Sequence, residues 1–201
     1  MLAPKKLLPF AALALVFAPV TAEAAALDVV NVGAPAINCV FNVTCTVVVS
    51  DSIGNFTPPG DGGNARLQSR TYPGLAPAPL AGKMAYEYRV DMTAATAPLA
   101  SNCVTAMQIT FGPITKGPYA PGGPQDVFVV TSGGLGSVGI DTATRGAGGV
   151  VVLNFAGSGV CPGQTSYFFG LASATTAPVP ATAKLFYSLG GLPGVVPVRV
   201  P

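Results

Sequence analysis

The chain has few residues that could carry out chemistry, because it contains no histidine. Without histidine, neither a Ser-His-Asp arrangement nor a Cys-His pair can form. Hydrolysis of a glycosidic bond would need two carboxyl groups about 5 to 9.5 Å apart. Glu87 and Asp91 share a face of one predicted strand, but they would lie about 13 Å apart. Two carboxyl groups from different strands could still lie close enough for this chemistry. We nevertheless expect a protein that is not an enzyme, with no catalytic residues and no cofactor.

The glycine-rich stretch from Gly54 to Arg70, GNFTPPGDGGNARLQSR, is part of the chain's best candidate for a metal-binding loop. Four oxygen-bearing side chains could surround a calcium ion if the loop folded back: Asp51, Asn55, Asp61 and Asn64. An EF-hand loop ends in a bidentate glutamate, however, and no glutamate follows Asp61 until Glu87. The alternative is a turn between two strands, stiffened by two prolines and relaxed by glycines that accept positive φ. We favour the turn, and therefore no metal site.

A second glycine-rich stretch, GLGSVG at residues 134–139, matches the spacing of a dinucleotide-binding loop. That fingerprint also needs a helix after the glycines and an acidic residue about 20 positions later. The residues that follow are β-branched and interrupted by glycine, and Asp141 is the last acidic residue of the chain. We therefore interpret this stretch as a flexible turn.

Four cysteines, an even number, indicate disulfides in an oxidising compartment. We favour the pairs Cys39–Cys45 and Cys103–Cys161. On a straight strand Cys39 and Cys45 would be about 20 Å apart, so this bridge requires a turn, for which Asn42 is suited. Without a turn, both would pair with Cys103 and Cys161 instead. Zinc binding is disfavoured, because there is no C-x-x-C pair and no histidine.

The first 26 residues are typical of an export signal. Lys5 and Lys6 precede an apolar run, residues 7–20, that is too short to span a membrane. Small residues then offer cleavage near Ala24 or Ala26. We expect a cleavable signal-peptide helix at residues 1–26, a single domain at residues 27–201 without a transmembrane segment, and a secreted or periplasmic location. The short, alanine-rich leader favours a bacterial source.

Charged residues are sparse throughout the chain. It has ten basic and eight acidic residues, and removal of Lys5, Lys6 and Glu23 leaves eight and seven, a net charge of +1. Nucleic-acid binding requires clustered lysine and arginine, so we expect no nucleic-acid partner.

The elements that must position these residues are strands, because apolar residues recur with a period of two. The clearest example is residues 83–92, KMAYEYRVDM, with Tyr86 and Tyr88 on one face and Glu87 and Arg89 on a face predicted to be solvated. Further strands are predicted to start at residues 45, 64, 102, 125, 137, 149, 165, 181 and 195. Turn-rich segments separate them, and no helix is predicted after the signal peptide. About 8–10 short strands predict an all-β antiparallel β-sandwich.

Phe168 is the residue most suggestive of a contact surface. Tyr167 and Phe169 share one face of a predicted strand, whereas Phe168 points to the other, so either a second layer covers it or it contacts a partner. We expect an exported, non-enzymatic subunit with a structural, adhesive or assembly role, whose partners are copies of itself, other envelope or matrix proteins, or polysaccharide. The alternative is a carbohydrate-binding or calcium-dependent binding module, for which the six tyrosines could supply stacking rings.

Overall fold

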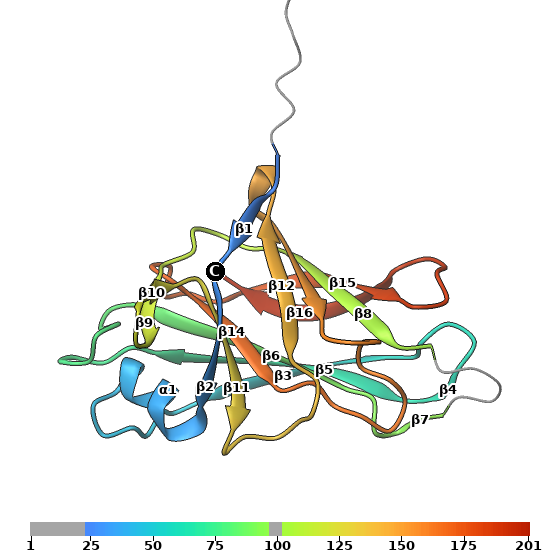
Figure 1. Cartoon of the computed structure of the whole chain (residues 1–201), viewed down its shortest axis with the longest axis horizontal. Helices are drawn as coiled ribbons and strands as arrows, with labels where there is room; N and C mark the ends of the chain where they lie inside the picture. Colours follow the sequence, from blue (N-terminus) through green and yellow to red (C-terminus); the bar gives the residue numbers. More distant parts are fainter. Residues whose placement is uncertain (1–22, 97–101) are drawn as a thin grey trace, which may run out of the picture.

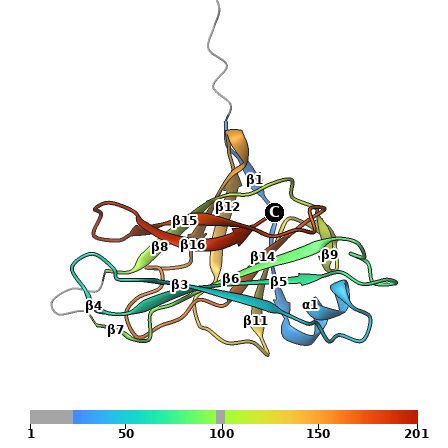
Figure 2. The same cartoon turned by 180° about the vertical axis from the view of Figure 1, so that it is seen from behind.

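The computed structural model describes residues 23–96 and 102–201. Within them, the chain forms two six-stranded sheets that lie one over the other (Figures 1 and 2). The predicted all-β antiparallel sandwich is confirmed. The predicted signal peptide falls mainly on residues 1–22, which lie outside the described residues. None of the helices in the described part of the chain is long and apolar enough to cross a membrane.

Strand order defines the two sheets. The first sheet contains, in spatial order, β1 (Ala25–Leu27), β12 (Ile140–Arg145), β13 (Val150–Phe155), β8 (Val104–Thr110), β15 (Val179–Tyr187) and β16 (Gly194–Val200). The second sheet contains β2 (Val29–Gly33), β11 (Val127–Ser132), β14 (Phe168–Ser173), β6 (Met84–Asp91), β5 (Ala65–Pro73) and β3 (Ser50–Phe56). Neighbouring strands are antiparallel, apart from the parallel pair of β2 and β11.

Smaller elements complete the fold. They are the pairs β4 (Gly62–Gly63) with β7 (Ala95–Thr96) and β9 (Gly117–Ala120) with β10 (Gly123–Gln125), the helix α1 (Ala34–Phe41), and the 3-10 turn η1 (Ala147–Gly149). The turn η1 joins β12 to β13, and this hairpin stands up from the sandwich together with β1 (Figure 1).

The main core lies between the two sheets and follows the period-two pattern. On β6, the inward residues Met84, Tyr86, Tyr88 and Val90 are all buried. The two tyrosines keep their hydroxyl groups satisfied: Tyr88 donates to the backbone carbonyl of Arg199 at 2.7 Å, and Tyr86 donates to that of Thr175. The rings therefore supply apolar area without leaving a buried donor unpaired.

A second, smaller core lies on the outer face of the second sheet. There α1 places Ile37, Val40 and Phe41 against Phe128 and Tyr72, and β9 packs beside them. Figure 2 shows α1 outside the sheet, on the side away from β15 and β16. The outer face of a sandwich sheet is thus partly covered by a third layer.

The sequence does not predict α1, because the helix lacks the usual capping signals. Its N-cap is Gly33, which offers no side-chain hydrogen bond, and its ends carry neither acidic nor basic residues. Proline in the first turn suits a helix start, but burial of one apolar face is what stabilises the helix here.

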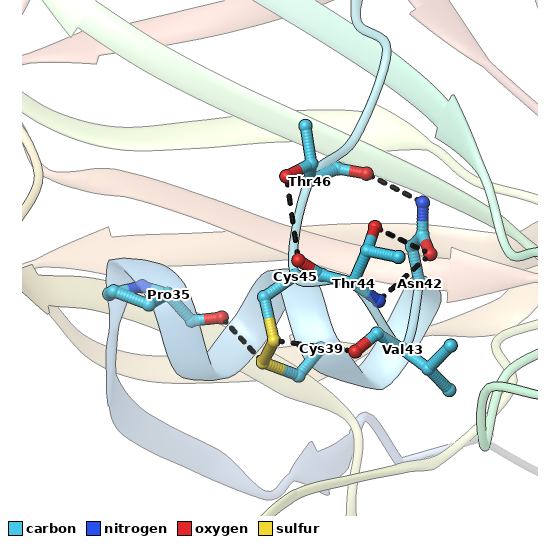
Figure 3. Close-up of a disulfide and its surroundings, with 7 residues drawn as sticks. All are labelled: Pro35, Cys39, Asn42, Val43, Thr44, Cys45 and Thr46. Carbon is cyan, nitrogen blue, oxygen red and sulfur yellow. Dashed lines mark hydrogen bonds between the residues drawn. A yellow bond between two sulfur atoms is a disulfide. The ribbon is translucent and has the colours of Figure 1, made fainter.

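The strand predicted from residue 45 is wrong over residues 45–49, since β3 begins only at Ser50. Cys45 has a φ of 58°, in the left-handed region that a strand does not use. Asn42 caps α1 and also holds the turn, because its side chain accepts from Thr44 and donates to the carbonyl of Thr46 (Figure 3).

That turn brings Cys39 and Cys45 together in one disulfide, and Cys103 and Cys161 form the other. These are the two pairs that the sequence favours. The second bridge ties the segment before β14 to the start of β8, where Val104 and Val160 also pair through their backbones. Two disulfides are typical of proteins in an oxidising compartment such as the periplasm or the extracellular space.

The N-terminal strands β1 and β2 lie at the edges of different sheets. Asp28, which joins these two strands, and Asp126, which precedes β11, both pair with Lys116, at 2.6 and 3.0 Å. Because β1 starts at Ala25, cleavage after Ala24 would keep it whole, whereas cleavage after Ala26 would leave only its last residue.

Candidate functional site

The outer face of the second sheet is divided into two halves. The half over β2, β11, β14 and the start of β6 is aromatic and lies under α1 and β9. The other half belongs to β3, β5 and β6, and we call it the polar half. Its members are Asp51, Ile53, Asn55, Arg66, Gln68, Arg70, Glu87, Arg89 and Asp91. Period-two alternation places these residues on one face, as the sequence predicts.

Glu87 is not solvated, contrary to the expectation for its strand. Only 6% of it is exposed, and its Oε1 accepts a 2.6 Å hydrogen bond from the Tyr72 hydroxyl. Burial raises the pKa of Glu87 to about 7, although the Tyr72 hydrogen bond and the charge of Arg70 oppose the shift. Burial, together with the charge of Glu87, likewise raises the pKa of Tyr72. The site therefore holds a carboxyl group that changes charge near neutral pH.

Phe168 is also buried, and only 5% of it is exposed. The guanidinium of Arg70 lies 4.1 Å from the centre of its ring, and that of Arg89 lies 5.0 Å away. Of the two alternatives for Phe168, the structure shows the ring buried, since two arginines lie against it and it packs in the second core. That a partner contacts the surface around Phe168 stays a prediction. Phe168 serves as a platform that holds two cations close together.

Asp91 pairs with two arginines on this face. Its Oδ2 lies 2.7 Å from Arg66 and 3.7 Å from Arg89, and its Oδ1 accepts from the backbone N–H and hydroxyl of Thr93. Burial opposes ionisation of Asp91, but the hydrogen bonds from Thr93 and Arg66 outweigh it and keep its pKa below the usual value.

Arg89 is less well paired than its neighbours. Its side chain is 14% exposed, its Nε has no partner, and burial lowers its pKa. The polar half thus carries three arginines against the aspartates Asp51 and Asp91, and Glu87 is neutral below about pH 7.

A cavity of about 240 Å³ opens where the two halves meet. Arg70, Glu87 and Phe168 line it from the sheet, and the start of α1 and residues 133–135 complete its walls. A smaller hollow of about 140 Å³ lies further along the polar half, lined by Ile53, Arg66, Gln68, Arg89 and Asp91.

A larger groove, about 640 Å³, lies between the ends of the two sheets. Four prolines line it, and its cation, Arg199, is hydrogen bonded to Ser50. It offers little chemistry, so we place the candidate site at the 240 Å³ cavity and the polar half.

The four possible calcium ligands do not gather at one point. Asp51 lies opposite Arg70 and accepts hydrogen bonds from Arg70 and Gln68, whereas Asn64 precedes β5 at its other end, about 20 Å along the strand. Asn55 lies opposite Arg66, and Asp61 belongs to the connection between β3 and β5. Residues 57–64 of this segment thus connect β3 to β5, and the first three residues of the segment belong to β3 itself. In the described ranges, no three His, Cys, Asp or Glu side chains lie close enough to hold a metal.

The GLGSVG stretch is a connection too, since strand β12 follows it rather than a helix. It contributes Gly134 and Leu135 to the lining of the cavity. The alternation of each strand predicts that Arg70 and Glu87 point outward. It does not predict that these two side chains lie beside Phe168.

Comparisons with protein-family models, with curated proteins and with solved structures find no match to this chain.

Proposed function

We propose that the protein is an exported, non-enzymatic β-sandwich that acts by surface contact, and that its contact surface is the polar half with the adjoining 240 Å³ cavity. One observation carries this proposal: α1 covers only part of a sheet face, and the rest bears three arginines beside a cavity. Sheet faces in sandwiches are normally either core or simply solvated, so a charged, hollowed face with a buried carboxyl group is a reasonable place for a partner.

The partner class is a structural or adhesive surface: copies of this chain, envelope or matrix proteins, or polysaccharide. Export is supported by the N-terminal signal pattern and by the two disulfides. A non-enzymatic role is favoured because Asp51 and Asp91, the nearest carboxylates to Glu87 on this face, are engaged by arginines.

The experiment is a retention assay with the non-reduced mature protein on cells, matrix fractions and a polysaccharide panel, combined with light scattering after size exclusion. Substitution of Arg66 and Arg89 by glutamine should reduce retention. Lys184→Gln is the matched control, since it removes one exposed cation from β15 of the first sheet. Equal retention of all variants would place the contact surface elsewhere.

A second candidate, a carbohydrate-binding module, is favoured by the size of the cavity. Pockets for drug-sized ligands span about 300–1,000 Å³, so 240 Å³ suits one sugar residue. The same panel, with and without calcium, tests it, and no retention on any sugar would remove this candidate.

A further inference from the structure

The cavity and the hollow beside it indicate which chemistry the polar half recognises. We propose that this face binds a polyuronate, an acidic polysaccharide in which carboxylates recur along the chain, with one uronate residue in the 240 Å³ cavity against Arg70 and Glu87. This inference rests on the proposed function, because it names the ligand of the same surface.

The first argument is the missing counter-charge. Arg89 is mostly buried, but its nearest carboxylate, Asp91, is 3.7 Å away and is already held by Arg66 at 2.7 Å. The Nε of Arg89 has no partner. A mostly buried cation without a close counter-ion is destabilising, so an anion that a ligand brings into the 140 Å³ hollow, which Arg89 lines, would offset its charge.

The second argument is the arrangement of the cations. The guanidiniums of Arg70 and Arg89 both stack on the ring of Phe168, and Arg66 lies four residues from Arg70 on β5. Guanidinium groups bind carboxylates through paired hydrogen bonds. One arginine lines the cavity and two line the 140 Å³ hollow, so the face suits successive carboxylates of a polymer more than a single anion.

The third argument is the shape and lining of the cavity. Its volume suits one compact residue, and its walls combine apolar side chains, Ile37, Val130 and Leu135, with the polar groups of Arg70 and Glu87. A pyranose ring with a carboxylate has an apolar face and a polar edge, which match these walls. Asn38 also lines the cavity, and a side-chain amide can bond to a hydroxyl group.

Glu87 makes binding pH-dependent. Its Oε1 already accepts from Tyr72, so the proton of the neutral acid is carried on Oε2 and can be donated to a ligand carboxylate. When Glu87 ionises, it repels that carboxylate. The ionisable groups around it are Arg70 and Tyr72 of β5, Asp51 of β3, and Arg89 of its own strand. The residues of α1 and β14, and residues 133–135, add no charged side chain.

The test is calorimetric titration of the non-reduced mature protein with trigalacturonate at pH 5.5 and pH 8.5, with its methyl ester as the neutral probe. We expect binding of the acid but not of the ester, and weaker binding at pH 8.5. Arg70→Gln should weaken binding at least about tenfold, the effect of losing one charge-assisted hydrogen bond. Lys184→Gln should change it less than about twofold, because Lys184 is an exposed cation of the first sheet.

Further variants keep the test independent of folding defects. The Glu87→Gln variant should bind trigalacturonate equally well at both pH values. Arg66→Gln, at a half-exposed position, should weaken binding of trigalacturonate more than binding of monomeric galacturonate. Equal binding of the acid and the ester would overturn the proposal, as would tighter binding of poly-glutamate, which would identify an acidic protein instead. If retention on surfaces depends on the arginines while trigalacturonate does not bind, the ligand is wrong but the contact surface stands.

Discussion

Replacement of Glu87 by glutamine should make the protein more stable at neutral and alkaline pH. Burial raises the pKa of Glu87 from 4.5 to about 7, so the folded protein keeps this carboxyl group neutral until about pH 7. The unfolded chain ionises it from about pH 4.5. Stability is therefore lost as the pH rises from about 4.5 to 7, and no more is lost above that range.

The magnitude follows from the pKa values. Each pKa unit is worth about 1.4 kcal/mol, so ionisation of Glu87 in the unfolded state removes about 3 kcal/mol of stability by pH 8. Glutamine stays neutral at every pH, and its carbonyl oxygen can still accept the hydrogen bond from Tyr72. The two proteins should be about equally stable at pH 4.5, and the variant should be about 2–3 kcal/mol more stable at pH 8.

The assay is equilibrium unfolding in urea at pH 4.5, 5.5, 7 and 8.5, with the disulfides intact. Asp91 has a lowered pKa, and its stabilising contribution is lost only as the pH falls below its usual value of 3.8, outside this range. Asp141→Asn, at an exposed position of β12, controls for the change in net charge. The same fall in stability from pH 4.5 to 7 in Glu87→Gln and in the unaltered protein would refute a buried, neutral Glu87.

Three further predictions test the fold. Cys103→Ser, which removes the disulfide that closes the 58-residue loop, should destabilise the protein by about 4 kcal/mol. Cys39→Ser, which opens a loop of only 6 residues, should cost about 2 kcal/mol, and urea unfolding measures both values. Gly170→Ala should lower stability by about 1–3 kcal/mol, since the added Cβ would lie 2.5 Å from a ring carbon of Phe128; thermal unfolding checks it. Cleavage of the proposed signal peptide should leave Ala25 at the N-terminus, because this position preserves all of β1; N-terminal sequencing checks it.

Each of these predictions has a contrary result. Equal effects of the two cysteine substitutions would contradict the loop-length argument. Gly139→Ala is the matched glycine control, because its added Cβ would meet only a Tyr167 ring atom at 3.9 Å; a loss of stability as large as that of Gly170→Ala would contradict the packing argument. An N-terminus at Leu27 would contradict the cleavage prediction, because most of β1 would then be absent from the mature protein.

Several elements could be predicted because their signal is local. The alternation of residues 83–92 appears in the structure as β6, with Tyr86 and Tyr88 inside, and the strands from residues 102, 149 and 181 appear as β8, β13 and β15. The helix α1 could not be predicted, because its stability comes from burial against residues far away in the sequence, such as Phe128, and not from caps.

The sequence by itself determined that this chain forms strands, which side chains share a face of each strand, that no histidine-dependent chemistry is available, and that its cysteines can pair. Only the tertiary structure decided that Arg70 lies opposite Glu87 and that Phe168 lies beneath two guanidiniums. Strand order and register join residues that are 17 to 98 positions apart here, and no local pattern encodes such pairing. The solvated face expected for β6 became partly buried for the same reason: the layer that covers Glu87 comes from a distant part of the chain.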